Sequence, residues 1–150
     1  MAMETGELDD LYRDAILDHS RNPRNPEPLV NPDLSGRAVN PFCGDEVDLQ
    51  INLDEGRVSR VGEQGQGCSI NQATSSLLSE ALRGKSIEEF AVVADLFKRM
   101  MGGETLSDSE SKQLGDLTAL AGVREFPVRI KCALLAWSAL EEALDGLARR

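Results

Sequence analysis

Three cysteines and one aspartate are the residues of this sequence whose types could bind a metal ion or react as nucleophiles. Cys43 and Asp45 flank Gly44 in the stretch NPFCGDEVDL, where alternating apolar residues begin. In an extended chain the side chains of residues i and i+2 point to the same side, and glycine lets the backbone bend if they must converge. One thiolate and one carboxylate suit a zinc-like ion. A turn before a strand, with Cys43 as a small apolar residue, explains this local pattern equally well.

The second cysteine, Cys68, follows two glycines in the stretch GQGCSIN, at the expected start of a helix. Unpaired backbone N–H groups and the helix dipole favour a thiolate there, which suits a metal ligand or a nucleophile. The alternative is a glycine-rich turn in which a small cysteine merely fits. A phosphate-binding loop is disfavoured, because the stretch lacks the lysine and the glycine spacing of such loops.

The third cysteine, Cys132, lies in the first turns of an expected helix with apolar residues at helical spacing, so taken alone it is better explained as a core residue. Arg129 precedes it by three residues, hence on the same helical face, and a cation there would stabilise a thiolate. His19 is the lone histidine. We expect it to have a polar surface or capping role in the N-terminal helix rather than to bind a metal.

Together the three cysteines make a stronger case than each alone, because each stands at a junction between expected elements. Three sulfurs and the oxygen of Asp45 would form a closed tetrahedral zinc site from dispersed segments. The absence of any C-x-x-C pair argues against a zinc ribbon or finger. A zinc hydrolase is disfavoured, because four protein donors leave no open coordination position. A non-catalytic, zinc-stabilised interaction domain remains an alternative.

The elements that must position these residues can be predicted from hydrophobic periodicity and turn residues. A proline-rich arm over 20–36 separates the first helix from the strands, and a capping box of Ser86 and Glu89 opens the helix expected over 87–101. Helices are expected over 8–19, 70–82, 87–101 and 106–120 and from Pro127 onward, and strands over 37–40, 47–53 and 58–61. This order predicts an α+β domain, with a small antiparallel sheet of about three strands and helices packed on one face.

Length and charge narrow the function further. The chain has 150 residues, enough for one domain with a core, and we expect residues 1–150 to form a single domain with a flexible segment over 1–7. A net charge of −10 argues against a nucleic-acid partner. There is no apolar run long enough to span a membrane and no secretory signal, so we expect a cytoplasmic protein with reduced thiols and no membrane partner.

Five stretches, in this order, resemble successive signatures of the SufU/IscU-like (NifU N-terminal-like) iron–sulfur cluster assembly family: LYRDAILDHSRNPRN, NPFCGDEVDL, GQGCSIN, LGDLTALAGV and FPVRIKCALLAW. The resemblance is closer to the SufU branch than to the IscU branch. Lys131 stands where IscU-type proteins carry a histidine, the segment 126–129 departs from their chaperone-binding motif, and 103–122 looks like the insertion typical of SufU. These departures argue against a DnaK-type chaperone partner and a stable cluster.

The resemblance implies a SufE/NifU-like fold and a Zn²⁺ ion held by Cys43, Asp45, Cys68 and Cys132. It implies that the protein is a zinc-dependent sulfurtransferase. Cys43 would accept persulfide sulfur from a SufS-type pyridoxal-phosphate (PLP)-dependent cysteine desulfurase and pass it to downstream Fe–S assembly proteins, with support from Arg129. The alternative is an iron–sulfur cluster assembly scaffold that holds a transient Fe–S cluster on its three cysteines.

Overall fold

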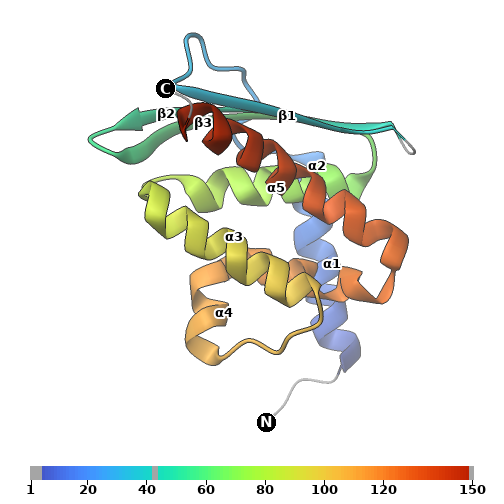
Figure 1. Ribbon diagram of the computed structural model, residues 1–150. Coiled ribbons are helices and arrows are strands. Elements are labelled where there is room, and N and C mark those ends of the chain that lie inside the picture. Colours follow the sequence, from blue (N-terminus) through green and yellow to red (C-terminus); the bar gives the residue numbers. More distant parts are fainter. Residues whose placement is uncertain (1–4, 42–43, 149–150) are drawn as a thin grey trace.

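The computed structural model describes the backbone over residues 5–41 and 44–148, and the side chains over 13–41 and 44–146. A three-stranded sheet lies on top of the helices, which all pack on one of its faces (Figure 1). In chain order the elements are α1 (Thr5–Arg21), β1 (Leu34–Asn40), β2 (Asp45–Asp54), β3 (Arg57–Gln66), α2 (Ser69–Leu82), α3 (Ile87–Met101), α4 (Asp108–Leu114), the 3₁₀ helix η1 (Gly115–Glu125) and α5 (Pro127–Ala148). The predicted α+β class is confirmed.

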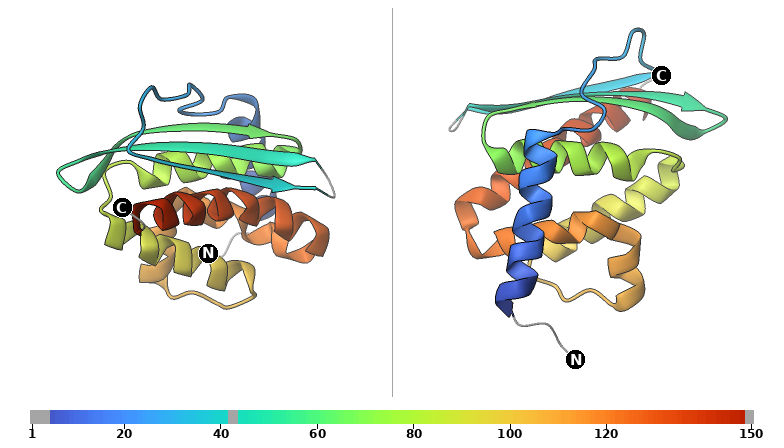
Figure 2. Two further views of the ribbon diagram at one scale, coloured as in Figure 1. Left: turned by 45° about the horizontal axis from the view of Figure 1, so that its top comes forward. Right: turned by 180° about the vertical axis from the view of Figure 1, so that it is seen from behind.

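The sheet is an antiparallel meander in the order β1-β2-β3. Val47, Leu49 and Ile51 point to the helices and are at most 1% exposed, as their alternation predicts. Both outer strands are longer than expected. β3 continues through two glycines, and a Cβ atom at Gly62 would come within 2.6 Å of the backbone oxygen of Glu27. The glycine that weakens the strand signal is therefore required by the proline-rich arm, which crosses the outer face of the sheet there (Figure 2).

Helices α2 and α5 lie directly beneath the sheet, and α5 packs on β1 almost backbone to backbone (Figure 1). A Cβ atom at Gly36 would clash with the carbonyl oxygen of Ala139 and would lie 2.8 Å from the nitrogen of Ala143. The backbone N–H of Arg37 donates to the carboxylate of Glu142 at 2.7 Å. These contacts fix where α5 lies along β1.

Helix α3 forms the next layer, where Phe97 stacks on Trp137 of α5 at 4.5 Å between ring centroids. Ser86 caps α3 by accepting from the N–H of Glu89, but the Glu89 side chain pairs with Arg57, so the predicted capping box forms only in part. The predicted helix over 106–120 is wrong in its extent. The segment forms two helices instead of one, because Gly115, with a φ of +57°, ends α4.

The segment after Gly115 is the 3₁₀ helix η1, and it is not polar on all sides. It buries Leu117, Leu120 and Val123 against the other helices. α4 begins with a full capping box between Ser107 and Glu110, which our sequence analysis overlooked. α4 and much of η1 occupy the region 103–122, whose assignment as an insertion stays a prediction.

Helix α1 runs across the back of the molecule (Figure 2) and begins at Thr5, inside the segment 1–7 that we expected to be flexible. The arm that follows is tied down by hydrogen bonds. The N–H of Glu63 donates to the carbonyl of Asn25 at 2.9 Å, and Gln64 donates to the carbonyl of Pro26 at 3.2 Å. Within the described part of the chain, no helix is long and apolar enough to cross a membrane.

Candidate metal centre

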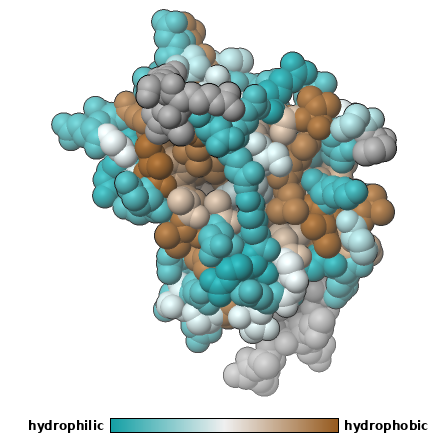
Figure 3. Space-filling view, viewed as in Figure 1, coloured by the Kyte–Doolittle hydropathy of each residue, from teal (hydrophilic) through white to brown (hydrophobic). Residues whose placement is uncertain are grey.

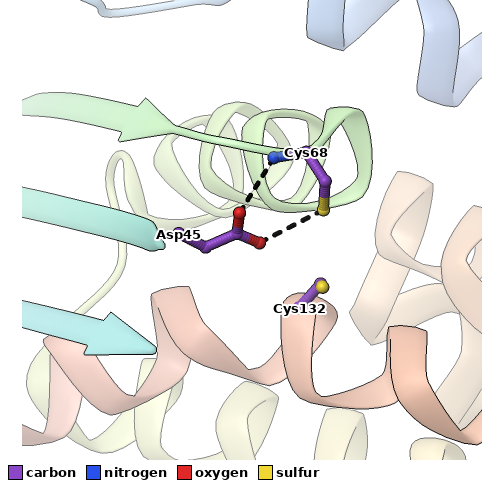
Figure 4. A group of neighbouring side chains, drawn as sticks. All are labelled: Asp45, Cys68 and Cys132. Carbon is purple, nitrogen blue, oxygen red and sulfur yellow. Dashed lines mark hydrogen bonds between the residues drawn. The ribbon is translucent and has the colours of Figure 1, made fainter. Parts of the chain in front are cut away.

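Three of the four predicted donors meet at one end of the sheet (Figure 4). Asp45 is the first residue of β2, Cys68 precedes α2, and Cys132 lies in the first turns of α5. One ligand atom from each lies within 4.8 Å of the others. Asp45 is 2% exposed and Cys132 7%, whereas Cys68 is half-buried. The fourth predicted donor, Cys43, lies outside the described residues.

Asp45 and Cys68 are joined by two hydrogen bonds. The backbone N–H of Cys68 donates to Oδ1 at 3.0 Å, and its thiol donates to Oδ2 at 3.2 Å. Cys68 is the N-cap of α2 but makes no capping bond with its own side chain. A carboxylate from a neighbouring strand thus lies at the positive end of the helix, where the helix dipole favours negative charge.

Gly67 permits this close approach. Its φ of +116° is a conformation that side-chain-bearing residues rarely adopt. A Cβ atom at this position would clash with the carboxylate of Asp45, lying 2.7 Å from its Cγ and 3.0 Å from its Cα. The glycine before the second cysteine is therefore part of the construction of the site.

Gly44 turns the chain between β1 and β2. Its φ is +76°, and its N–H donates to the carbonyl of Asn40 at 2.8 Å. Asn40 and Asp45 are paired across the two strands. The backbone therefore bends at Gly44, as the glycine allows, and both interpretations of the CGD stretch, a metal-binding pair or a turn before a strand, stay open.

The Cys132 thiol is neutral in this environment. Burial is the main cause that raises its pKa to about 12, and the neighbouring Cys68 and Asp45 side chains add to the effect. Two cysteine sulfurs and one carboxylate oxygen are donors that Zn²⁺ binds in tetrahedral sites. The described donors therefore fit such an ion, and binding it would displace the Cys132 proton.

His19 lies elsewhere. It is 8% exposed, so its expected surface position is wrong, and its Nδ1 lies 2.8 Å from the hydroxyl of Ser76. It lines a separate cavity of about 430 Å³ with Arg24 and Asp116 among others. Burial, and next the charge of Arg24, lower its pKa. Among the described residues the histidine takes no part in the three-donor group.

Arg129 is exposed and lines a cavity of about 500 Å³ between α1, the start of α2 and the end of η1. No hydrogen bond or ion pair joins its guanidinium group to another described residue. Its support of sulfur transfer stays a prediction.

Asn71 is a residue of the site region that our sequence analysis overlooked. It lies in the first turn of α2, is fully buried, and bonds to both strands that lead to the centre. No signal in the sequence could have found it, because an asparagine is common near the start of a helix and both of its acceptors are backbone carbonyls.

Comparison with known proteins establishes the family. The family model described as the NifU-like N terminal domain matches residues 11–133. The chain belongs to this NifU-like family. The family resemblance inferred from the five sequence stretches is thereby confirmed.

Relatives in the NifU-like family match nearly the whole chain. The "Zinc-dependent sulfurtransferase SufU" of Bacillus subtilis (strain 168) is 43% identical over 91% of this chain and 91% of its own. The "Iron-sulfur cluster assembly scaffold protein IscU" of Streptococcus pyogenes serotype M1 is 39% identical over 95% and 87%. The crystal structure of FiSufU from Fervidobacterium islandicum AW-1 has a TM-score of 0.81 at 29% identity, covering 94% of this chain and 99% of its own.

Proposed function

We propose that this protein is a zinc-dependent sulfurtransferase of iron–sulfur cluster assembly, which accepts persulfide sulfur from a SufS-type, PLP-dependent cysteine desulfurase. The observation that carries the proposal is the convergence of Asp45, Cys68 and Cys132 from three separate segments, with donor atoms within 4.8 Å of one another. The similarity to a named zinc-dependent sulfurtransferase supports it.

In this proposal Asp45, Cys68 and Cys132 hold Zn²⁺ together with Cys43, which directly precedes Gly44 in the sequence. When bound, the ion supplies Lewis acidity that keeps cysteine sulfurs deprotonated at neutral pH. The protein's own contribution is the burial of two donors, Asp45 and Cys132, and the two hydrogen bonds that hold Asp45 to Cys68.

Cys43 is the proposed acceptor. Its thiolate attacks the terminal sulfur of the donor persulfide, the donor S–S bond breaks, and the desulfurase cysteine leaves as a thiolate. The product is a persulfide on Cys43, with no net oxidation or reduction. Asp45, Cys68 and Cys132 keep the site assembled while Cys43 reacts. The sulfur then passes to a downstream Fe–S assembly protein in the cytoplasm.

The surface beside the centre supports a protein partner. Figure 3 shows apolar surface on the side of the molecule where α5 begins. Val39 near the end of β1 is 47% exposed, and Phe126 and Val128 at the start of α5 are 59% and 81% exposed. Large exposed apolar side chains near a functional site are typical of an interaction surface.

The test is the turnover of a purified SufS-type desulfurase with cysteine, with and without the zinc-loaded protein. We expect at least a 10-fold stimulation, which is lost in Cys43→Ala and after zinc removal. Ser138→Ala is the control, because this exposed hydroxyl bonds only within α5. No stimulation by the zinc-loaded protein would refute the sulfurtransferase function.

A scaffold function is the second candidate, supported by the similarity to a named IscU scaffold. It predicts that anaerobic reconstitution yields iron and acid-labile sulfide bound to the three cysteines. Lys131, exposed beside Cys132, offers a cation where a neutral donor would be needed, and this disfavours a stable cluster.

A further inference from the structure

Asn71 connects the two strand ends that carry the metal donors. Its side-chain nitrogen donates to the carbonyl of Glu46 at 3.1 Å and to the carbonyl of Gln66 at 2.9 Å. Glu46 and Gln66 are partners in the last pair of the β2–β3 ladder. Glu46 directly follows Asp45, and Gln66 precedes Cys68 by two residues. One carboxamide thus ties the end of the sheet to the first turn of α2, beside both donors.

The other polar atom of the Asn71 side chain has no partner among the described residues. Asn71 is fully buried, and its Oδ1 makes no hydrogen bond with any described group. A buried acceptor without a partner costs free energy, so an apolar residue of the same size would avoid that cost. What the apolar residue could not supply is the pair of N–H donors.

The choice of side chain fits two carbonyl acceptors. A neutral amide nitrogen carries two hydrogens, whereas a serine hydroxyl carries one and a lysine would bring a charge into the interior. The helix also lies close enough for so short a side chain to reach the strands. A Cβ atom at Gly65 would come within 2.9 Å of the hydroxyl of Ser75 on α2.

We propose that Asn71 is a positioning residue of the metal centre, whose two hydrogen bonds hold Asp45 and Cys68 at ligand distance from each other. The inference rests on the proposed function and deepens it. Asp45, Cys68 and Cys132 must keep their places whenever Cys43 leaves the ion to accept sulfur. Asn71 supplies that rigidity from outside the set of donors.

The test compares Asn71→Leu with Thr74→Val. Thr74 is equally buried on the same helix, and its hydroxyl donates only to the carbonyl of Ile70, so Thr74→Val removes a buried polar group without touching the strands. Zinc affinity is measured by competition with a chromophoric chelator, and Co²⁺ substitution reports the donor geometry by its absorption spectrum. Asn71→Ser serves as a second variant if the leucine perturbs packing.

Loss of the two bonds should weaken zinc binding about 10- to 100-fold, as removal of groups that orient ligands typically does, and should change the Co²⁺ spectrum. Thr74→Val should leave both unchanged. Equal affinities and spectra for the two variants would overturn the proposal.

A metal-free readout separates this inference from the proposed function. In a Cys43→Ser, Cys132→Ser background only Cys68 can be alkylated, and Asn71→Leu should speed its alkylation several-fold, because the thiol is no longer held against Asp45. An unchanged rate would refute the positioning role. If the wild-type protein failed to bind zinc, the proposed function would fall, and the alkylation rates would still decide the role of Asn71.

Discussion

Substitution of Gly67 by alanine should disrupt the metal centre more than it strains the backbone. Two costs are expected. A residue with a Cβ atom at positive φ costs about 1–2 kcal/mol. The Cβ atom would also displace the Asp45 carboxylate, which accepts from the N–H of Cys68 at 3.0 Å, and a hydrogen bond to a charged group contributes about 1.5–3 kcal/mol. Gly67→Ala should therefore destabilise the metal-free protein by about 2.5–5 kcal/mol.

Gly56→Ala is the matched control. Gly56 in the β2–β3 turn also has a positive φ, +78°, but a Cβ atom there would meet nothing within 4 Å. Gly56→Ala should therefore lower the free energy of unfolding only by the cost of a Cβ atom at positive φ, about 1–2 kcal/mol. Urea unfolding at neutral pH measures both, and with an m-value of about 2 kcal/mol/M the Gly67 variant should unfold at roughly 2 M lower urea.

Zinc affinity then shows whether the substitution disturbs the metal centre or only strains the backbone. Gly67→Ala should bind zinc at least 10-fold more weakly, and Gly56→Ala should bind it normally. In an Asp45→Ala background most of the clash is gone, so Gly67→Ala should cost less there than in the wild type. If Gly67→Ala and Gly56→Ala matched in both stability and zinc affinity, the close approach of Gly67 to Asp45 would not be a constraint on the site.

Three further predictions follow from buried and capping groups. Burial raises the pKa of Glu63 to about 8, against 4.5 for the unfolded chain, so its contribution to stability is fully present below pH 4.5 and is lost as the pH rises towards 8. Glu63→Gln should flatten the pH dependence of urea unfolding by on the order of 3–5 kcal/mol, and parallel wild-type and variant profiles would contradict this. Zinc binding at pH 7 should release at least one proton per ion, because the Cys132 thiol, with its pKa of about 12, is protonated beforehand. Calorimetric titration in two buffers of different ionisation enthalpy measures that release, and equal heats would contradict it. Ser107→Ala breaks the capping box with Glu110 and should cost about 1 kcal/mol, seen as a lower Tm; an unchanged Tm would show that α4 does not depend on its cap.

The sequence predicted those parts of the site that depend only on the chemistry of the residue types. Thiol and carboxylate groups are ligands that Zn²⁺ binds, so Asp45, Cys68 and Cys132 could be proposed as donors before any geometry was known. The central strand could be predicted as well, because Val47, Leu49 and Ile51 alternate on a buried face.

The parts that could not be predicted depend on contacts between distant segments. Gly65 weakens the pattern of strand β3, and Gly67 follows the strand directly. Both positions need a glycine, because α2 approaches Gly65 closely and the Asp45 side chain approaches Gly67. His19 was expected at the surface, but Ser76, 57 residues away, gives it a buried partner. Asn71 is inconspicuous in the sequence because its two acceptors are backbone carbonyls. Every residue has such a carbonyl, so the sequence does not show which of them will accept.

The backbone contact between β1 and α5 has a consequence for any attempt to transplant this site. Cys132 lies on the same helix as Ala139, seven residues or about 10 Å along its axis. A side chain at Gly36 would lift the helix from the strand, and a stiff helix would carry that shift to Cys132. Gly36 holds no metal donor, yet it cannot gain a side chain, because the atoms it would meet belong to the backbone of α5 at Ala139 and Ala143. A designer who grafts the donors onto another sheet must therefore copy this distant glycine–alanine contact as well.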